Sequence, residues 1–189
     1  MRKIVSFTHV SLDGFVCGLN GELEWVNVGD EIYADVEPRL HKIGAAVYGR
    51  VTYGMMAGYW PTVPSNPDSS ARDLAHAAWV EEIPKIVVSR SLEKAEWNNT
   101  TLIRDHVAEE IGKLKQQSGD DLMIFGSPKL THLLAQLGLV DEYLMYLNPV
   151  VIGAGTPLFE VGSKPSSLKL LEEKRFDAGV IALRYTLDR

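Results

Sequence analysis

Short apolar segments with strand character alternate with segments of helical spacing along the chain. The apolar runs at 45–48 and 121–125 each lead directly into a helix start, and a further run covers 85–89. A helix between two strands is the usual crossover that joins parallel strands, and a hairpin turn cannot replace it. The pattern therefore predicts an α/β fold, a three-layer sandwich in which helices flank a twisted, mostly parallel sheet.

The expected bounds follow from the same periodicities. Strands are expected at 2–10, 45–48, 85–89, 100–103, 121–125 and 140–151, and helices at 30–42, from Gly49, at 70–82, 105–117 and 128–137. Segments 168–176 and 180–187 should form a terminal antiparallel hairpin.

The proline-rich stretch 59–69 and residues 153–157 are expected to be irregular, and Pro38 is expected to kink or split its helix. Because strand patterns on both sides of 59–69 need one another as partners, a single domain of residues 1–189 is predicted.

Composition excludes several classes of function. The formal net charge of −6 is a poor balance for following a nucleic-acid backbone, and no run of 18 apolar residues is present for a membrane span. With Cys17 as the single cysteine, an internal disulfide or a cysteine-based zinc site is impossible. The start of the chain goes straight into a strand pattern without a signal peptide, so a cytoplasmic protein with a small-molecule substrate is expected.

Several familiar catalytic and nucleotide motifs are absent from the sequence. It contains no GxxxxGK[ST], HExxH or GxSxG motif, and Gly153-Ala-Gly155-Thr-Pro-Leu lacks the third glycine of GxGxxG. The five histidines (His9, His41, His76, His106 and His132) are scattered. They are interpreted as surface or structural residues, and no metal site is predicted.

Three strand ends carry residues suited to binding anions. Gly126-Ser127-Pro128-Lys129 follows one strand, Gly49-Arg50-Val51-Thr52 a second, and Ser89-Arg90 a third. Helix N-termini, hydroxyls and arginines bind phosphate groups, and ligands of α/β sheets lie beyond the carboxyl ends of the strands. Capped helix starts and arginines paired with surface carboxylates are the alternative interpretation. Taken together, the three junctions favour a dinucleotide.

The same junctions carry a resemblance to a known family. Gly49–Tyr53, Val88–Arg90 and Ile124–Pro128, followed by Gly138–Tyr143 and Pro149–Gly153, resemble the dihydrofolate reductase-like superfamily, and most closely its RibD C-terminal family, the reductase domain of riboflavin biosynthesis. The likeness runs from Ser11-Leu12-Asp13-Gly14 to the final hairpin. It implies an NADPH-dependent reductase that is usually a homodimer.

By position, the resemblance implies roles for individual residues. Trp25 and Thr52 lie against the cofactor, Arg39 against the substrate, and the turn formed by Gly126, Ser127, Pro128, Lys129 and Leu130 around the diphosphate. Asp30 stands five places after a tryptophan, as does the acid that protonates the pterin in dihydrofolate reductases. Without the family, Trp25 is equally a loop anchor, Arg39 a solvated residue and Asp30 a helix N-cap.

Two positions depart from the family pattern. Riboflavin reductases generally have an acidic substrate-binding residue where this chain has Phe125, and dihydrofolate reductases have a double glycine where it has Gly126-Ser127.

The sequence predicts a reductase that transfers a hydride from NADPH to a C=O or C=N bond of a small heterocycle, similar to 5-amino-6-(5-phosphoribosylamino)uracil reductase. NADPH is preferred over NADH through Arg50, helped by Ser89 and Arg90. A non-catalytic nucleotide-binding dimer and a dihydrofolate reductase are the two alternatives.

Overall fold

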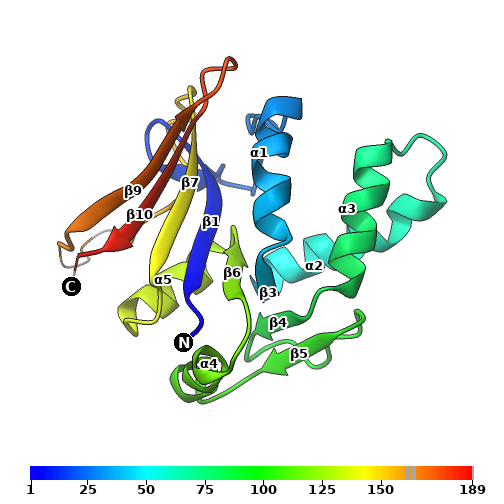
Figure 1. Cartoon of the computed structure of the whole chain (residues 1–189), viewed down its shortest axis with the longest axis vertical. Helices are drawn as coiled ribbons and strands as arrows, with labels where there is room; N and C mark the ends of the chain where they lie inside the picture. Colours follow the sequence, from blue (N-terminus) through cyan, green and yellow to red (C-terminus); the bar gives the residue numbers. More distant parts are fainter. Residues whose placement is uncertain (161, 163–164, 189) are drawn as a thin grey trace.

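The sheet at the centre of the computed structural model is parallel over most of its width (Figure 1). The structure describes residues 1–160, 162 and 165–188, which form an eight-stranded sheet in the order β5-β4-β3-β6-β1-β7-β10-β9. Its strands are β1 (Ile4–Ser11), β3 (Ile43–Gly49), β4 (Lys85–Val88), β5 (Thr100–Ile103), β6 (Asp121–Phe125), β7 (Glu142–Asn148), β9 (Leu168–Arg175) and β10 (Ile181–Leu187). All pairings from β5 to β7 are parallel, and β10 pairs antiparallel with β7 and β9. The predicted fold class and terminal hairpin are confirmed.

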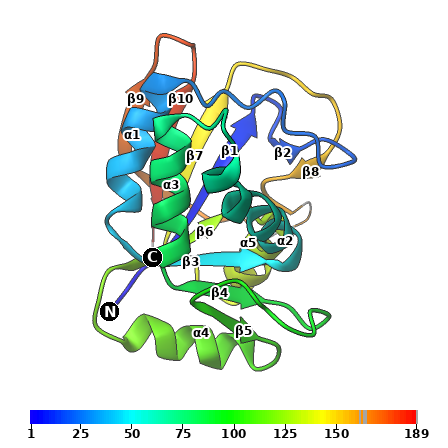
Figure 2. The ribbon, with the colours of Figure 1, turned by 90° about the vertical axis from the view of Figure 1, so that its right-hand side faces the viewer.

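Helices cover both faces of the sheet (Figures 1 and 2). The helices are α1 (Asp30–Leu40), α2 (Arg50–Tyr59), α3 (Ala71–Glu82), α4 (Val107–Gln116) and α5 (Pro128–Gln136). In β3, Ala46 and Tyr48 pack with the buried residues of α1, α2 and α3, whereas Ala45 and Val47 pack with those of α4 and α5. Successive side chains of a strand point to opposite faces, so the uninterrupted apolar runs produce a sheet that is buried on both sides.

Local sequence signals explain several helix ends. Ser70 and Asp73 form a reciprocal capping box at the start of α3, as the Ser69-Ser70 pair predicted. Pro38 lies inside α1, which continues through it to Leu40, so the expected split of this helix at Pro38 does not occur. Gly138 has a φ of +68° just beyond α5, a conformation that glycine adopts at little cost.

Two segments differ from the sequence prediction. Part of the proline-rich stretch forms a 3₁₀ helix, η1 (Trp60–Ser65), in which Pro61 stands near the start and Val63 is buried. Prolines are tolerated in the first turn of a helix because the N–H they lack has no helical partner there. The end of the expected 153–157 loop, β8 (Thr156–Pro157), pairs with β2 (Phe15–Cys17) in a second small sheet.

Tyr48 supplies a test of the packing. It is fully buried in β3, and its hydroxyl has no hydrogen-bond partner among the described residues. An unpaired buried hydroxyl costs about 1–3 kcal/mol, so Tyr48→Phe should raise the free energy of unfolding by about 1 kcal/mol in urea denaturation. Tyr146→Phe is the matched control, since the Tyr146 hydroxyl donates to Asp35 at 2.6 Å and its loss should destabilise the protein. A destabilised Tyr48→Phe variant would contradict this account.

Candidate active site

The carboxyl ends of three neighbouring parallel strands bring the predicted phosphate-binding junctions to one edge of the sheet. β3 lies between β4 and β6, with Gly49 opposite Val88 and Val47 opposite Ile124. The segments that follow these strands, at Gly49-Arg50, Ser89-Arg90 and Gly126-Ser127, therefore leave the sheet at the same edge. This is the edge at which ligands of α/β sheets bind. We call it the carboxyl edge.

A hydrogen bond joins two of these junctions. The Gly49 N–H donates to the Ser127 hydroxyl at 3.0 Å, although the two residues are 78 positions apart. Ser127 was expected to cap α5 with its side chain, but it makes no such bond, because its hydroxyl is turned to Gly49. Gly126 and Ser127 have φ values of +52° and +44°. The serine thus adopts the left-handed conformation that a second glycine would adopt most easily.

The helix starts at this edge have the features of an anion site. Neither α2 nor α5 has a side-chain N-cap hydrogen bond, and both begin at the carboxyl edge. Arg50, Arg90 and Lys129 are exposed, and within the described chain the side chain of none of the three forms a hydrogen bond or an ion pair. Helix N-termini attract anions, and unpaired cations beside them strengthen that attraction. The alternative that these arginines pair with surface carboxylates is not what the structure contains.

Other predicted cofactor residues shape the backbone around this edge. The buried Ser89 hydroxyl accepts hydrogen bonds from Ser91 N at 3.2 Å and Leu92 N at 3.0 Å, which fixes its own turn. Leu130 is buried in the core, and a Cβ added at Gly49 would lie 3.6 Å from the Leu130 Cβ, an ordinary contact. Thr52 is half-buried in the first turn of α2.

Trp25 and Asp30 have only local or interhelical contacts. The half-buried Trp25 donates from Nε1 to the Glu22 carbonyl at 3.2 Å, a contact within its own loop. Asp30 is the first residue of α1, one position after the N-cap Gly29, so its interpretation as the N-cap is wrong by one residue. Its carboxylate is fully exposed and lies 3.2 Å from Arg72 of α3. The contact links the starts of α1 and α3 at the surface.

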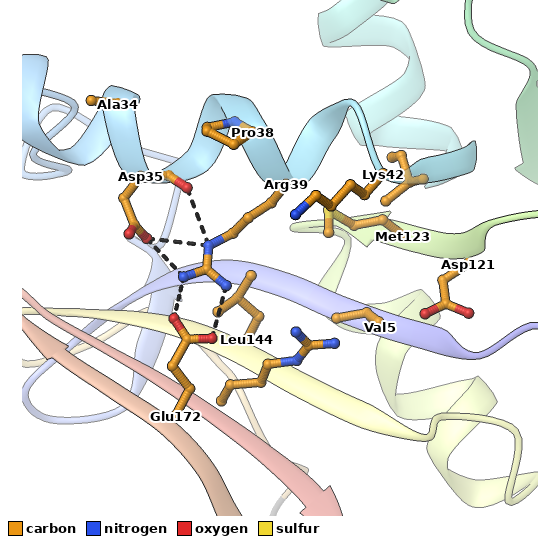
Figure 3. Close-up of a pocket in the computed structure, with 12 residues that line it drawn as sticks. Val5, Ala34, Asp35, Pro38, Arg39, Lys42, Asp121, Met123, Leu144 and Glu172 are labelled. Atoms are coloured by element: carbon orange, nitrogen blue, oxygen red, sulfur yellow. Dashed lines mark hydrogen bonds and ion pairs between the residues drawn. The ribbon is translucent and has the colours of Figure 1, made fainter.

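Arg39 lies in an ionic cluster (Figure 3). Its guanidinium bonds to Asp35 at 3.1 Å and to both carboxylate oxygens of Glu172 on β9. Asp35 also accepts from the Tyr146 hydroxyl at 2.6 Å and from Lys174 at 2.7 Å. Arg39 was expected to contact the substrate or to be solvated; in the structure its donors are occupied by carboxylates.

The electrostatics of this cluster are those of paired charges. The hydrogen bond with Glu172 raises the pKa of Arg39, and the same bond lowers the pKa of Glu172. Burial opposes the ionisation of Asp35, but bonds from Lys174 and Tyr146 outweigh it and lower the pKa of that carboxyl.

The cluster borders a cavity of about 520 Å³ whose lining includes Val5 and Asp121, at the starts of β1 and β6. Arg39 thus borders a cavity at the opposite ends of these strands from the carboxyl edge.

Two histidines interpreted as surface or structural residues are mostly enclosed by aromatic rings. Burial lowers the pKa of His9 and of His76 to about 4, so both are neutral at pH 7. His76 of α3 lies 4.3 Å from the ring of Trp60, and His9 of β1 lies 5.2 Å from the ring of Tyr146. The alternation along β1 places His9 on the same face as Phe7, a signal present in the sequence.

Comparison with known proteins identifies the family of the chain. The family model described as the RibD C-terminal domain matches residues 2–182. The chain belongs to the RibD C-terminal domain family. The "Uncharacterized protein YyaP" of Bacillus subtilis (strain 168) is 33% identical over 187 residues, which cover 97% of this chain and 94% of YyaP.

Solved structures share the fold of this RibD C-terminal domain. RibD from Acinetobacter baumannii, in its form 2, superposes with a TM-score of 0.70 at 16% identity and covers 99% of this chain and 58% of RibD. Dihydrofolate reductase from Enterococcus faecalis, complexed with NADP(H), superposes with a TM-score of 0.64 at 14% identity, over 99% of this chain and 97% of that reductase. The predicted family and the dihydrofolate reductase-like fold are confirmed.

In the described residues no helix has the length and apolar character needed to span a bilayer.

Proposed function

We propose that this RibD C-terminal domain is an NADPH-dependent reductase that transfers a hydride to a C=O or C=N bond of a small substrate. The observation that carries the proposal is the carboxyl edge, where the Gly49–Ser127 hydrogen bond joins two helix N-termini. Beside them stand Arg50, Arg90 and Lys129, whose side chains are unpaired among the residues that the structure describes. A dinucleotide presents a diphosphate and a 2′-phosphate, and this edge offers donors and positive charge for both.

Each part of the edge has a role in the proposed reaction. The backbone from Gly126 to Leu130 holds the diphosphate, Arg50 with Ser89 and Arg90 holds the 2′-phosphate, and Trp25 and Thr52 lie against the cofactor. NADPH, when bound, supplies the hydride. The protein aligns the cofactor with the acceptor carbon and delivers a proton through Asp30 or water.

A second candidate function has one observation in its favour. Asp30, the predicted acid, is fully exposed and pairs with Arg72. Arg39, the predicted substrate-binding residue, pairs with Asp35 and Glu172. This favours a non-catalytic nucleotide-binding dimer. Incubation with NADPH and a panel of pterins, pyrimidinones and simple ketones separates the two: oxidation of NADPH supports the reductase, and binding without oxidation supports the module. Light scattering tests the dimer.

The diphosphate contact is tested at Gly126. A Cβ there meets no protein atom within 4 Å, so Gly126→Asn, which tolerates a positive φ, should fold normally yet block the close approach of a diphosphate. We expect NADPH affinity to fall by about tenfold or more in calorimetry, which corresponds to about 1.4 kcal/mol. Gly138→Asn is the control, because Gly138 has a similar φ of +68° and equally open space at the far end of α5. If the two variants bound NADPH with equal affinity, the diphosphate would not bind at Gly126.

The choice between NADPH and NADH is tested at Arg50. A charge-assisted pair with the 2′-phosphate is worth about 1.5–3 kcal/mol, so Arg50→Ala should weaken NADPH binding by about ten- to a hundredfold. NADH affinity should change little, and the NADPH loss should shrink as salt rises. Equal losses for both cofactors, or no loss for either, would show that Arg50 does not bind the 2′-phosphate.

The role of Asp30 is tested against that of its partner. If Asp30 delivers the proton, Asp30→Asn should lower the hydride-transfer rate by about tenfold or more while NADPH affinity stays the same, because the lost interaction acts in the transition state. Arg72→Gln removes the same ion pair but leaves the carboxylate in place. Rates that fall equally in the two variants would show that only the contact between α1 and α3 matters.

A further inference from the structure

A row of aromatic side chains begins where the proposed cofactor turn begins. Phe125, the residue before Gly126, has its ring 5.6 Å from Phe7 and 6.2 Å from Trp79 of α3. The Trp79 ring lies 5.2 Å from His76, and His76 lies 4.3 Å from Trp60 of η1. We call these five residues the aromatic row. The elements β1, β6, α3 and η1 contribute to it, and all of its spacings are within the range of direct ring contact.

Most residues of the row are only partly buried. Phe125 is buried, but Phe7, Trp60, His76 and Trp79 are all half-buried. A single exposed ring needs no explanation, whereas connected, partly exposed rings next to a functional edge indicate a binding surface. Flat aromatic ligands stack on such rings, and each stacked ring contributes appreciably to affinity.

The row carries no net charge near pH 7. Burial lowers the pKa of His76 to about 4, although the negative charge of Asp73 partly opposes that shift. Asp73 itself is held in the capping box with Ser70. The other four members of the row have no ionisable group, so the surface suits a neutral ligand.

Two arginines on the helices of this face, Arg39 of α1 and Arg72 of α3, are already engaged, and Lys42 lies by the cavity at the opposite ends of the strands. Arg39 bonds to Asp35 and Glu172, and Arg72 bonds to Asp30 and lies over the ring of Tyr33 at 5.1 Å. The unpaired Arg50, Arg90 and Lys129 stand on the carboxyl edge, where the proposed function assigns them to the cofactor. A substrate phosphate would thus lack a positive partner beside the row, and an unpaired phosphate there would be costly to desolvate.

We propose that the substrate of this enzyme is an uncharged planar heterocycle, without a phosphate group, that stacks on the aromatic row next to Gly126. The inference rests on the proposed function, because the cofactor turn is what places the row at the reacting end of the site. It separates this chain from riboflavin reductases, whose substrate is phosphorylated.

The test uses riboflavin and its 5′-phosphate, a pair of flat heterocycles that differ only in the phosphate, with lumazine as a smaller neutral probe. Stacking on tryptophan quenches flavin fluorescence, so binding is followed by that quenching, and for lumazine by quenching of protein fluorescence. We expect riboflavin and lumazine to bind, and the phosphate of the larger probe to bring no gain beyond about threefold. Tighter, salt-sensitive binding of the phosphorylated probe, or no quenching with any of the three, would overturn the proposal.

Variants assign the binding to the row. Trp79→Leu and Trp60→Leu should each weaken binding by about ten- to a hundredfold, and Trp79→Phe should retain most of it. Phe159→Leu is the control, since Phe159 is an exposed ring that contacts Tyr143, a residue of the α4 and α5 face. Unchanged affinity in both tryptophan variants would overturn the proposal. NADPH affinity, measured on the same proteins by calorimetry, reports on the cofactor site alone, so failure of the row and failure of the proposed function are distinguishable.

Discussion

The hydrogen bond from the Gly49 N–H to the Ser127 hydroxyl holds together the two crossovers on which the candidate site depends. It forms because β3 and β6 are parallel neighbours, so that α2 and α5 both begin just beyond the same edge of the sheet. In accepting this bond the Ser127 side chain gives up the usual capping role. The Ser127 carbonyl accepts from the Leu130 and Thr131 N–H groups at 2.9 and 3.0 Å, and Pro128 has no N–H, so the Lys129 N–H is left without a partner among the described residues. One interaction thus fixes the geometry of the edge, and the Lys129 N–H remains available to a ligand there.

Charge is distributed differently at the two ends of the sheet. At the carboxyl edge Arg50, Arg90 and Lys129 are unpaired within the described residues, in a protein whose formal net charge is −6. At the other end Asp35 and Arg39 link α1 to the β9–β10 hairpin through bonds to neighbouring side chains. Breaking this cluster would leave the buried Asp35 carboxylate with fewer partners, which is destabilising. The cluster is therefore part of the framework, and the capacity to bind anions lies at the edge.

Local patterns in the sequence predicted most of the fold, because they report on local structure. The Ser70 cap of α3, the parallel strands and the closing hairpin all follow from periodicity and short motifs. The partners of the site residues could not be predicted in that way. Arg39 pairs with Glu172, 133 residues away, and Ser127 adopts a positive φ that its residue type disfavours. Such features depend on tertiary packing, which overrides local preference.

The residue at position 125 illustrates how the packing selects a side chain. Phe125 lies among the rings of Phe7, Tyr48 and Trp79, at 5.6, 5.8 and 6.2 Å. A carboxylate in that place would be buried among apolar groups, and no described cation is bonded to any of these three neighbours; burying such a charge without a partner costs several kcal/mol. The aromatic rings around position 125 therefore favour an apolar side chain there, and an acid at this position would need a different set of neighbours.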